Sequence, residues 1–580
     1  MRRISIPYSV VSIGSYSFNG CDSLIEISIP SSVKLIESNA FSSCKTLQKV
    51  SIPFSVSEIQ SNAFLGCFSL QKVIIPSSVT SIGPCCFRYC SSLNEVLISS
   101  SLTNISQYLF GQCTSLKQII IPSSVTSIDE GAFSECSSLI YVSIPSSVTF
   151  INGRAFSRCS SLRQISIPSS VTRIEESIFD QCSSLTNVSI PSSVTSISSY
   201  IFYKCSLLSQ FTIPSSVTSI EISAFEGCSS LMQLTIPSSV TFVNKNAFKD
   251  CSSLTQIDLS SSLTSLDEGL FLGCAMLAQI TIPSSVKSIG SQSFQGCSAL
   301  KEISIPSSVT TIGFKAFEGC SSLLHIEIPS SVTSIGFYAF KGCSALNHVI
   351  IPSSINMLGQ FTFYGCSSLA QLIIPSSIVS IGESCFDGCS SLAQVMLPSS
   401  LASIGCYAFH ECASITQVTI PPSVTSIGFH SFSGCLSLVH VSLPSSITSI
   451  GEGLFRGCSS LVQISIPSSV TSICFSAFDC CSSLEKIIIP SSVNSIGYSV
   501  FNDCSSLVQI TFEKPSSLSS IGFCAFKNCS SLKRITVPSS VTKIGNRAFD
   551  GCSSLLEIEI PSSLNSFNVI LDHDYHLIRY

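Results

Sequence analysis

The sequence contains no tryptophan, only seven histidines and few charged residues. Charged side chains make up 11% of the 580 residues, about half of the share in a typical soluble domain. The net charge is −5 and the lysines and arginines are scattered, so no basic patch for nucleic acid or acidic membrane surfaces is expected. Proline and serine interrupt every apolar run well before the ~18 residues that a membrane-spanning helix needs. The composition therefore predicts neither nucleic-acid binding nor a membrane span.

Motifs for catalysis and cofactors are also missing. The sequence has no G-x-S-x-G, no phosphate-binding glycine loop, no dinucleotide fingerprint and no C-x-x-C pair. Serine pairs recur in nearly every segment, but no histidine recurs at a fixed distance from them, as a catalytic triad would require. We therefore predict that the chain is not an enzyme and binds no cofactor.

What the sequence does contain is a strict repeat. Cysteines recur every 23 residues from Cys21 to Cys504 and then at Cys529 and Cys552, which makes 24 positions. A phenylalanine stands three residues before each of them, and a leucine stands three residues after each, except at Ile415. The register slips once, at the two-residue insertion Glu513-Lys514. A period of 23 residues lies in the range of leucine-rich repeats and outside that of helical repeats and propeller blades.

Each repeat predicts one coil of a solenoid. The segment Leu-x-x-Ile-x-Ile-Pro alternates apolar and variable residues and predicts a short strand that proline ends. Glycine after the next isoleucine favours a tight corner. Ala-Phe-x-x-Cys is too short for a free-standing helix and predicts a single helical or 3₁₀ turn. One coil cannot bury its apolar side chains alone, so stacked neighbours must complete the core. We expect a solenoid of 24 coils over residues 1–564 and a C-terminal cap or tail over residues 565–580.

The repeat resembles that of the BspA-like branch of leucine-rich-repeat proteins. The matching pattern is clear at Ala316-Phe317, Cys320, Leu323, Ile326, Ile328 and Pro329, and it continues through Val332, Ile335 and Gly336. The resemblance covers about residues 4–564. It implies a right-handed curved rod with a parallel β-sheet on its concave side and extended or short helical turns on the convex side. It also implies a surface antigen or adhesin that binds host matrix proteins or other cells, and it brings no catalytic residues.

A ligand would meet the residues that alternate with the buried isoleucines of the strands. The positions five residues after the repeat cysteines form one such column, which is mostly glutamine. We take as tentative ligand-binding residues of this column Gln118, Tyr141, Gln164, Gln210, Gln233, Gln256, Gln279, Glu302, His325, His348, Gln371, Gln394, Gln417, His440, Gln463 and Gln509. The column seven residues after the cysteines is mostly serine or threonine, with isoleucine at 74, 120, 350, 373 and 488. Two interpretations stay open: this neutral face only solvates the sheet, or it binds a protein or glycan through many weak contacts.

Two further groups of residues call for an interpretation. Glu302, His325 and His348 occupy consecutive coils of the same column, which makes them weak candidates for a divalent metal site; the alternative is two exposed histidines on a polar face. The repeat cysteines are expected to stack as buried, reduced thiols, because parallel side chains keep their Cβ atoms too far apart for disulfides.

The sequence supports two functional hypotheses. The first is a non-enzymatic, surface-associated adhesin that binds a protein, such as a matrix protein or a cell-surface glycoprotein, as a monomer. The second is an intracellular scaffold for protein partners, or a fragment of a longer surface protein. Resemblance favours the cell surface, whereas reduced cysteines and the absence of a recognisable secretion signal leave the cytoplasm open.

Overall fold

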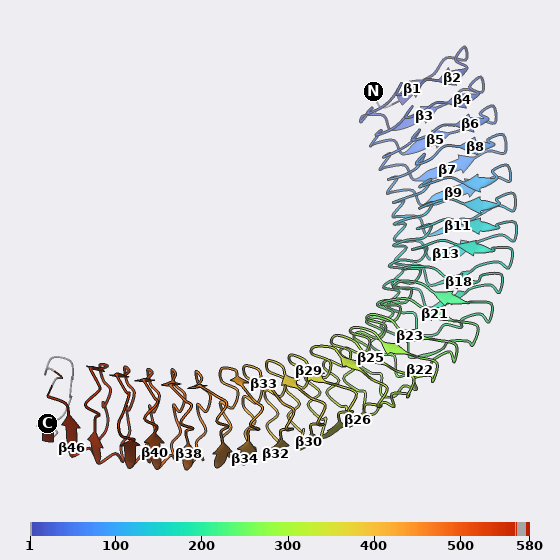
Figure 1. Cartoon of the computed structure of the whole chain (residues 1–580). Coiled ribbons are helices and arrows are strands. Elements are labelled where there is room, and N and C mark those ends of the chain that lie inside the picture. The colour runs from blue at the N-terminus through green and yellow to red at the C-terminus, as the bar shows by residue number, and fades with distance from the viewer. Residues whose placement is uncertain (1–2, 563, 565–575, 580) are drawn as a thin grey trace. The chain divides into compact units, whose positions relative to one another are not determined.

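The computed structural model describes residues 3–562, 564 and 576–579, and the chain divides into two units, Met1–Val286 and Lys287–Tyr580. In each unit the chain winds into stacked coils, and successive coils lie side by side (Figure 1). The predicted solenoid of parallel strands is therefore confirmed. Most of the predicted cap over residues 565–580 lies outside the described residues, apart from a strand at its end. No helix long and apolar enough to cross a membrane occurs in the described part of the chain.

Most coils contribute a longer strand after the leucine and a two-residue strand before the corner that glycine often occupies. In unit 1 the longer strands are β1 (Arg3–Ser5), β3 (Glu26–Ser28), β5 (Lys49–Ser51), β7 (Lys72–Ile75), β9 (Glu95–Ile98), β11 (Gln118–Ile120), β13 (Tyr141–Ser143), β15 (Gln164–Ser166), β17 (Asn187–Ser189), β20 (Gln233–Thr235) and β22 (Gln256–Asp258). The two-residue strands of unit 1 are β2 (Ser12–Ile13), β4 (Leu35–Ile36), β6 (Glu58–Ile59), β8 (Ser81–Ile82), β10 (Asn104–Ile105), β12 (Ser127–Ile128), β14 (Phe150–Ile151), β16 (Arg173–Ile174), β18 (Ser196–Ile197), β19 (Ser219–Ile220), β21 (Phe242–Val243) and β23 (Ser265–Leu266).

Unit 2 repeats this arrangement. Its longer strands are β26 (His325–Glu327), β28 (His348–Ile350), β30 (Gln371–Ile373), β32 (Gln394–Met396), β34 (Gln417–Thr419), β36 (His440–Ser442), β38 (Gln463–Ser465), β40 (Lys486–Ile489), β42 (Gln509–Phe512), β44 (Arg534–Thr536), β46 (Glu557–Ile560) and β47 (His576–Arg579). Its two-residue strands are β24 (Ser288–Ile289), β25 (Thr311–Ile312), β27 (Ser334–Ile335), β29 (Met357–Leu358), β31 (Ser380–Ile381), β33 (Ser403–Ile404), β35 (Ser426–Ile427), β37 (Ser449–Ile450), β39 (Ser472–Ile473), β41 (Ser495–Ile496), β43 (Ser520–Ile521) and β45 (Lys543–Ile544).

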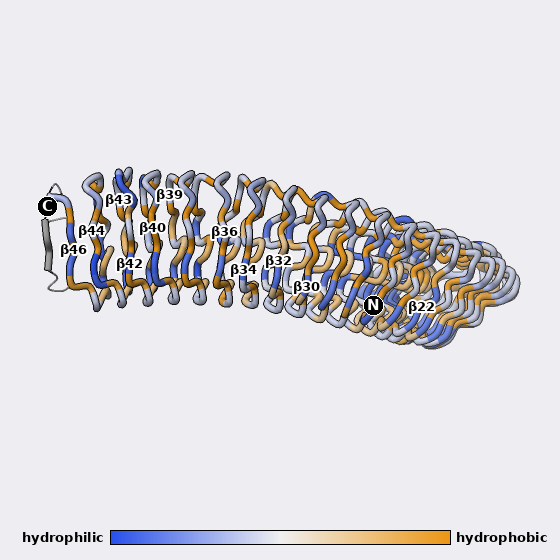
Figure 2. The backbone as a smooth tube through the Cα atoms, turned by 60° about the horizontal axis from the view of Figure 1, so that its bottom comes forward, coloured by the Kyte–Doolittle hydropathy of each residue, from blue (hydrophilic) through white to orange (hydrophobic). Residues whose placement is uncertain are grey.

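The register of the strands keeps equivalent residues in line. Ile27 of β3 pairs with Val50 of β5, and Val349 of β28 pairs with Leu372 of β30, each in parallel orientation. Hydrophobic segments of successive coils consequently lie beside one another (Figure 2). Because the register equals the sequence period, each repeat position becomes a column of side chains along the unit.

The core consists of such columns of phenylalanine, cysteine, leucine and isoleucine. The phenylalanine rings stack nearly parallel: the centroids of Phe41 and Phe64 lie 5.1 Å apart, and those of Phe317 and Phe340 lie 5.4 Å apart with 3° between the ring planes. These rings are fully buried. Each gains dispersion and hydrophobic energy only when the next coil covers it, which is why the stack of coils and not the single coil is the stable structure.

The short helical turn predicted for Ala-Phe-x-x-Cys is wrong. The amides of this segment alternate between two kinds of partner: Ser42 N donates within its coil to the Asn39 carbonyl, whereas Phe41 N donates to the Ala63 carbonyl of the next coil. Asn39 and Ser43 also have left-handed backbones, with φ values of 58° and 60°. A right-handed helix requires consecutive amides to bond within the segment and φ to stay negative, so neither condition is met.

One coil of unit 1 departs from the pattern. Phe211 stands where other coils have isoleucine, valine or leucine, and its ring centroid lies 5.1 Å from that of Phe202 and 5.2 Å from that of Phe225. The two column rings are tilted by 32° to each other instead of stacking flat. Residues 210–212, which the structure describes, form no strand. The extra ring explains the tilt of the two column rings, because a well-packed core accepts added volume only by shifting its neighbours.

The glycine corners set how closely two coils approach. A Cβ atom added to Gly336 would lie 2.4 Å from the amide nitrogen of Phe314 in the preceding coil. At Gly451, the same repeat position, the nearest atom to an added Cβ would be the Ile427 carbonyl oxygen, 3.9 Å away. The backbone is in an ordinary conformation at both glycines, so close approach and not a left-handed turn makes glycine necessary at Gly336.

We expect Gly336→Ala to destabilise its coil and Gly451→Ala to leave its coil unchanged or slightly more stable. The first substitution forces backbone atoms apart, at a cost of about 1–3 kcal/mol, whereas the second mainly restricts the unfolded chain. Amide hydrogen exchange read by mass spectrometry measures the local opening free energy around each site. Equal protection of residues 310–340 in both variants would contradict this account of the corner.

Candidate functional site: the strand face

The longer strands present one solvent-exposed surface, here called the strand face. It consists of the side chains five and seven residues after each repeat cysteine. In β20, for example, Gln233 and Thr235 are exposed and Leu234 between them is buried. This alternation follows from the strand backbone, which directs successive side chains to opposite sides of the sheet.

The predicted ligand-binding residues all lie on this face, and the structure leaves their binding role a prediction. All of them are exposed except His348, which is half-buried. Several are paired in register, among them Gln118 with Tyr141, Gln233 with Gln256, and Gln417 with His440. Gln210, Gln279 and Glu302 lie in coils where the described residues form no strand of two or more residues.

The strand face also carries two apolar stripes that the sequence analysis recognised only in part. In unit 1, Ile74, Leu97 and Ile120 stand in consecutive coils with exposed fractions of 50%, 50% and 73%. In unit 2, Ile350, Ile373 and Met396 are in register on β28, β30 and β32 and are 47%, 68% and 82% exposed. The isoleucines were noted from the sequence, but Leu97 and Met396, which make each stripe continuous, were missed. Counting leucine and methionine in the same column would have found them.

Beside the stripe of unit 1, the strand face is hollowed. A cavity of about 450 Å³ is lined by Tyr141, Val142, Ser143, Ile144, Gln164, Ile165, Ser166, Pro168, Asn187 and Ser189. Two of the predicted ligand-binding residues, Tyr141 and Gln164, are therefore brought together, and Asn187 joins them through its pairing with Gln164. None of these ten lining residues is charged.

The metal site predicted at Glu302, His325 and His348 spans three consecutive coils. His325 and His348 are register partners on β26 and β28. Among the described residues, the three potential ligands whose donor atoms lie within 4.8 Å of one another are instead Asp479, Cys480 and Asp503. The predicted site stays a prediction.

The second group of three is engaged in hydrogen bonds. Asp479 accepts one from Asn502 at 2.9 Å and one from the Arg456 guanidinium at 3.1 Å. Asp503 accepts from Asn528 at 2.8 Å as well as from Asn502. Because a cation already neutralises Asp479 and amides satisfy both carboxylates, this cluster is a hydrogen-bond network and does not need a metal ion.

A separate surface, here called the turn face, contains the residues five and two positions before each cysteine. In unit 2 the charged and aromatic side chains of this face form ion pairs and cation–π contacts with one another. Glu318 bridges Lys315 at 3.2 Å and Lys341 at 3.4 Å, and both ammonium groups lie over the ring of Tyr338. Tyr338 stacks on Phe361 at 4.7 Å. The sequence analysis missed this face, although aromatic and charged residues recurring at these two positions would have indicated it.

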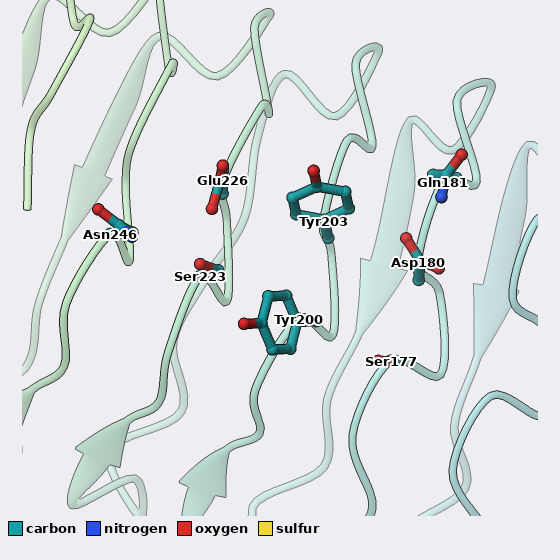
Figure 3. Close-up of a pocket in the computed structure, with 8 residues that line it drawn as sticks. All are labelled: Ser177, Asp180, Gln181, Tyr200, Tyr203, Ser223, Glu226 and Asn246. Atoms are coloured by element: carbon teal, nitrogen blue, oxygen red, sulfur yellow. The ribbon is translucent and has the colours of Figure 1, made fainter. Parts of the chain in front are cut away.

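The turn face of unit 1 has a hollow of about 380 Å³, shown in Figure 3. Tyr200 and Tyr203 stand in its middle, between Asp180 on one side and Glu226 on the other. Glu226 binds Lys249 at 2.9 Å, and the Lys204 ammonium lies 5.1 Å from the Tyr203 ring centroid. With two acidic and two basic groups in close proximity, the charges around this hollow are largely compensated.

The cysteine column is buried in the core, and its thiols are unreactive. All 31 cysteines are free. The Cys320 thiol donates to the Phe294 carbonyl of the preceding coil at 3.2 Å, and burial raises its pKa well above the ordinary value. Cys480 lies outside the repeat column and is exposed. Partial burial, together with the carboxylates of Asp479 and Asp503, raises its pKa to about 11, so it is a poor nucleophile at neutral pH.

The sequence matches the family described as BspA type leucine rich repeat region (6 copies) over residues 1–117, 103–232, 195–324, 310–439, 402–515, 425–555 and 511–569. No curated protein sequence matches the chain.

Two solved structures are similar. A leucine-rich repeat protein from Bacteroides ovatus is 32% identical with a TM-score of 0.51, over 63% of this chain and 88% of that one. A leucine rich cell surface protein from Faecalibacterium prausnitzii is 33% identical with a TM-score of 0.41, over 56% of this chain and 89% of that one.

We predict that alkylation of the folded protein by iodoacetamide separates Cys480 from the cysteine column. Only the thiolate reacts, so the rate at Cys480 should rise about tenfold per pH unit between pH 7 and 9.5, below its raised pKa. Cys320 should stay unlabelled throughout, because it is buried. Mass spectrometry of quenched samples gives both rates, and the chain unfolded in guanidinium serves as the control in which every cysteine reacts. A rate at Cys480 that levels off below pH 9 would disprove the raised pKa.

Proposed function

Because the chain belongs to the BspA-type leucine-rich repeat family, we propose that it is a recognition protein that binds other proteins through its strand face. Solenoid proteins of this fold class expose long, regular surfaces that other molecules can contact, and they bury their repeated apolar residues in the core. The finer proposal is an adhesin-like protein of the cell surface, with matrix proteins or cell-surface glycoproteins as partners.

The observation that carries this proposal is the apolar stripe Ile74, Leu97 and Ile120. Single exposed apolar side chains are normal, whereas three in line within a polar surface are typical of interaction sites. Covering side chains that are half exposed or more removes apolar area from water, and a partner gains about 25 cal/mol for each Å² buried. The surrounding glutamines and serines provide the polar rim that protein interfaces have around an apolar centre.

A second candidate function, an intracellular scaffold, is favoured by the free cysteines. A chain with 31 free thiols is typical of a reducing compartment. Burial weakens this argument, because most of these thiols are protected from oxidants wherever the protein resides. Surface biotinylation of intact expressing cells separates the two functions: labelled protein supports the adhesin, and protein recovered only unlabelled from the lysate supports the scaffold.

We expect Leu97→Asp to weaken binding to a purified matrix protein by at least about tenfold, with fibronectin, laminin and collagen as the immobilised probes. A carboxylate at the centre of the stripe would lose its water on binding without finding a counter-charge. Leu207→Asp is the matched control: Leu207 is 51% exposed, as Leu97 is 50%, but it lies outside the strand face. Surface plasmon resonance measures the dissociation constants.

The controls of this experiment decide what a loss of binding means. Circular dichroism should be the same for both variants, since neither leucine is part of the core. Binding of the wild type to none of the probes, or equal loss in both variants, would overturn the assignment of the stripe as the docking surface for matrix proteins.

A further inference from the structure

The hollow of the strand face in unit 1 differs from the rest of that face. Tyr141, 47% exposed, forms one wall, and the amides of Gln164 and Asn187 follow on the next two strands. Tyr141 is the single tyrosine of its column, which from Gln118 to Gln279 contains no charged residue. The hollow therefore combines a flat ring with neutral polar groups.

The polar groups of the hollow are available to a ligand. The side chains of Tyr141, Gln164 and Asn187 have no hydrogen-bond partner among the described residues, whereas Gln256 on the same face donates to Asp258 at 3.3 Å. The hydroxyls of Ser166 and Ser189, which also line the hollow, lie 3.5 Å apart. Amides and hydroxyls both donate and accept, so this lining can pair with groups that do the same.

We propose that this hollow is a subsite for a neutral sugar ring. This inference rests on the proposed function, because it places the ligand on the same strand face. A sugar ring has hydroxyls around its rim that both donate and accept, and its C–H groups form an apolar face. The rim would pair with Gln164, Asn187 and the serines, while the C–H face would lie against the exposed ring of Tyr141. The volume of about 450 Å³ lies within the usual range of small-ligand sites, ~300–1,000 Å³.

Other ligand classes match the lining less well. A charged group would lose water without meeting an opposite charge, since none of the lining residues is ionised. A purely apolar group would cover the two free amides and leave them without partners, which is costly. A neutral polyol avoids both penalties.

The test uses the full chain and three neutral oligosaccharides, namely cellohexaose, maltohexaose and N-acetylchitohexaose, each titrated by calorimetry and saturation-transfer NMR. At least one should bind the wild type at up to about 10 mM, and Tyr141→Ala and Asn187→Ala should each lower its association constant about tenfold. Tyr141→Phe keeps the ring and should retain binding within about threefold. Tyr498→Ala, which removes a tyrosine of 61% exposure from unit 2, should change nothing.

Two results would overturn the sugar subsite: no binding of any of the three probes, or unchanged binding in Tyr141→Ala with wild-type circular dichroism. A matrix glycoprotein, tested before and after enzymatic removal of its glycans, distinguishes the source of the sugar. Loss of Tyr141-dependent binding on deglycosylation assigns the subsite to protein-linked glycans, and oligosaccharide binding without that loss assigns it to free polysaccharide. Leu97→Asp should leave oligosaccharide binding intact. The oligosaccharide titrations therefore test the sugar subsite independently of the protein-docking proposal.

Discussion

The carbonyl oxygens of nearly all core phenylalanines accept two hydrogen bonds, and the stacking of the coils depends on this shared acceptor. Phe41 O accepts the amide of Cys44 in its own coil at 3.3 Å and the thiol of Cys67 in the next coil at 3.2 Å. The first bond closes the turn and the second ties it to its neighbour. Alanine at the cysteine position would fill part of the space but could not make the second bond, which explains why a cysteine recurs in every coil.

This constraint favours one register between neighbouring coils and thereby creates the strand face. The thiol meets the phenylalanine carbonyl only when the coils stay in register, and the same register aligns the strands residue by residue. Exposed positions of the strand face can then vary with little effect on the core, because their side chains point to the opposite side of the sheet. A stripe such as Ile350, Ile373 and Met396 forms because the register places the same repeat position of neighbouring coils in line.

The regular part of this structure could be predicted from the sequence, and the irregular part could not. Phenylalanine, cysteine and leucine at fixed spacing define the core because each has one position in the coil. The turn was predicted wrongly because Ala-Phe-x-x-Cys has the apolar spacing of a helix. The amide of Phe41 donates to the carbonyl of Ala63 in the next coil and not to a residue of its own turn, so its partner depends on the neighbouring coil. The tilt of the core rings at Phe211 and the hollow at Tyr141 depend on how one side chain packs among its neighbours, which a repeat pattern does not describe.

The turn face and the strand face differ in how many of their polar groups lack a hydrogen-bond or ionic partner, and this difference favours the strand face as the binding surface. On the turn face of unit 2, Glu318, Lys315 and Lys341 already pair with one another, so a ligand would have to compete with existing contacts. On the strand face, the amides of Gln164 and Asn187 lack partners within the described chain, and apolar side chains stand open beside them. A partner that covers this face must form hydrogen bonds with the unpaired amides, because otherwise binding carries the free-energy cost of removing their water. Burial of the apolar stripes, in contrast, stabilises any complex in which the partner makes close contact. Affinity would therefore come mainly from the stripes, and discrimination between partners mainly from the amides.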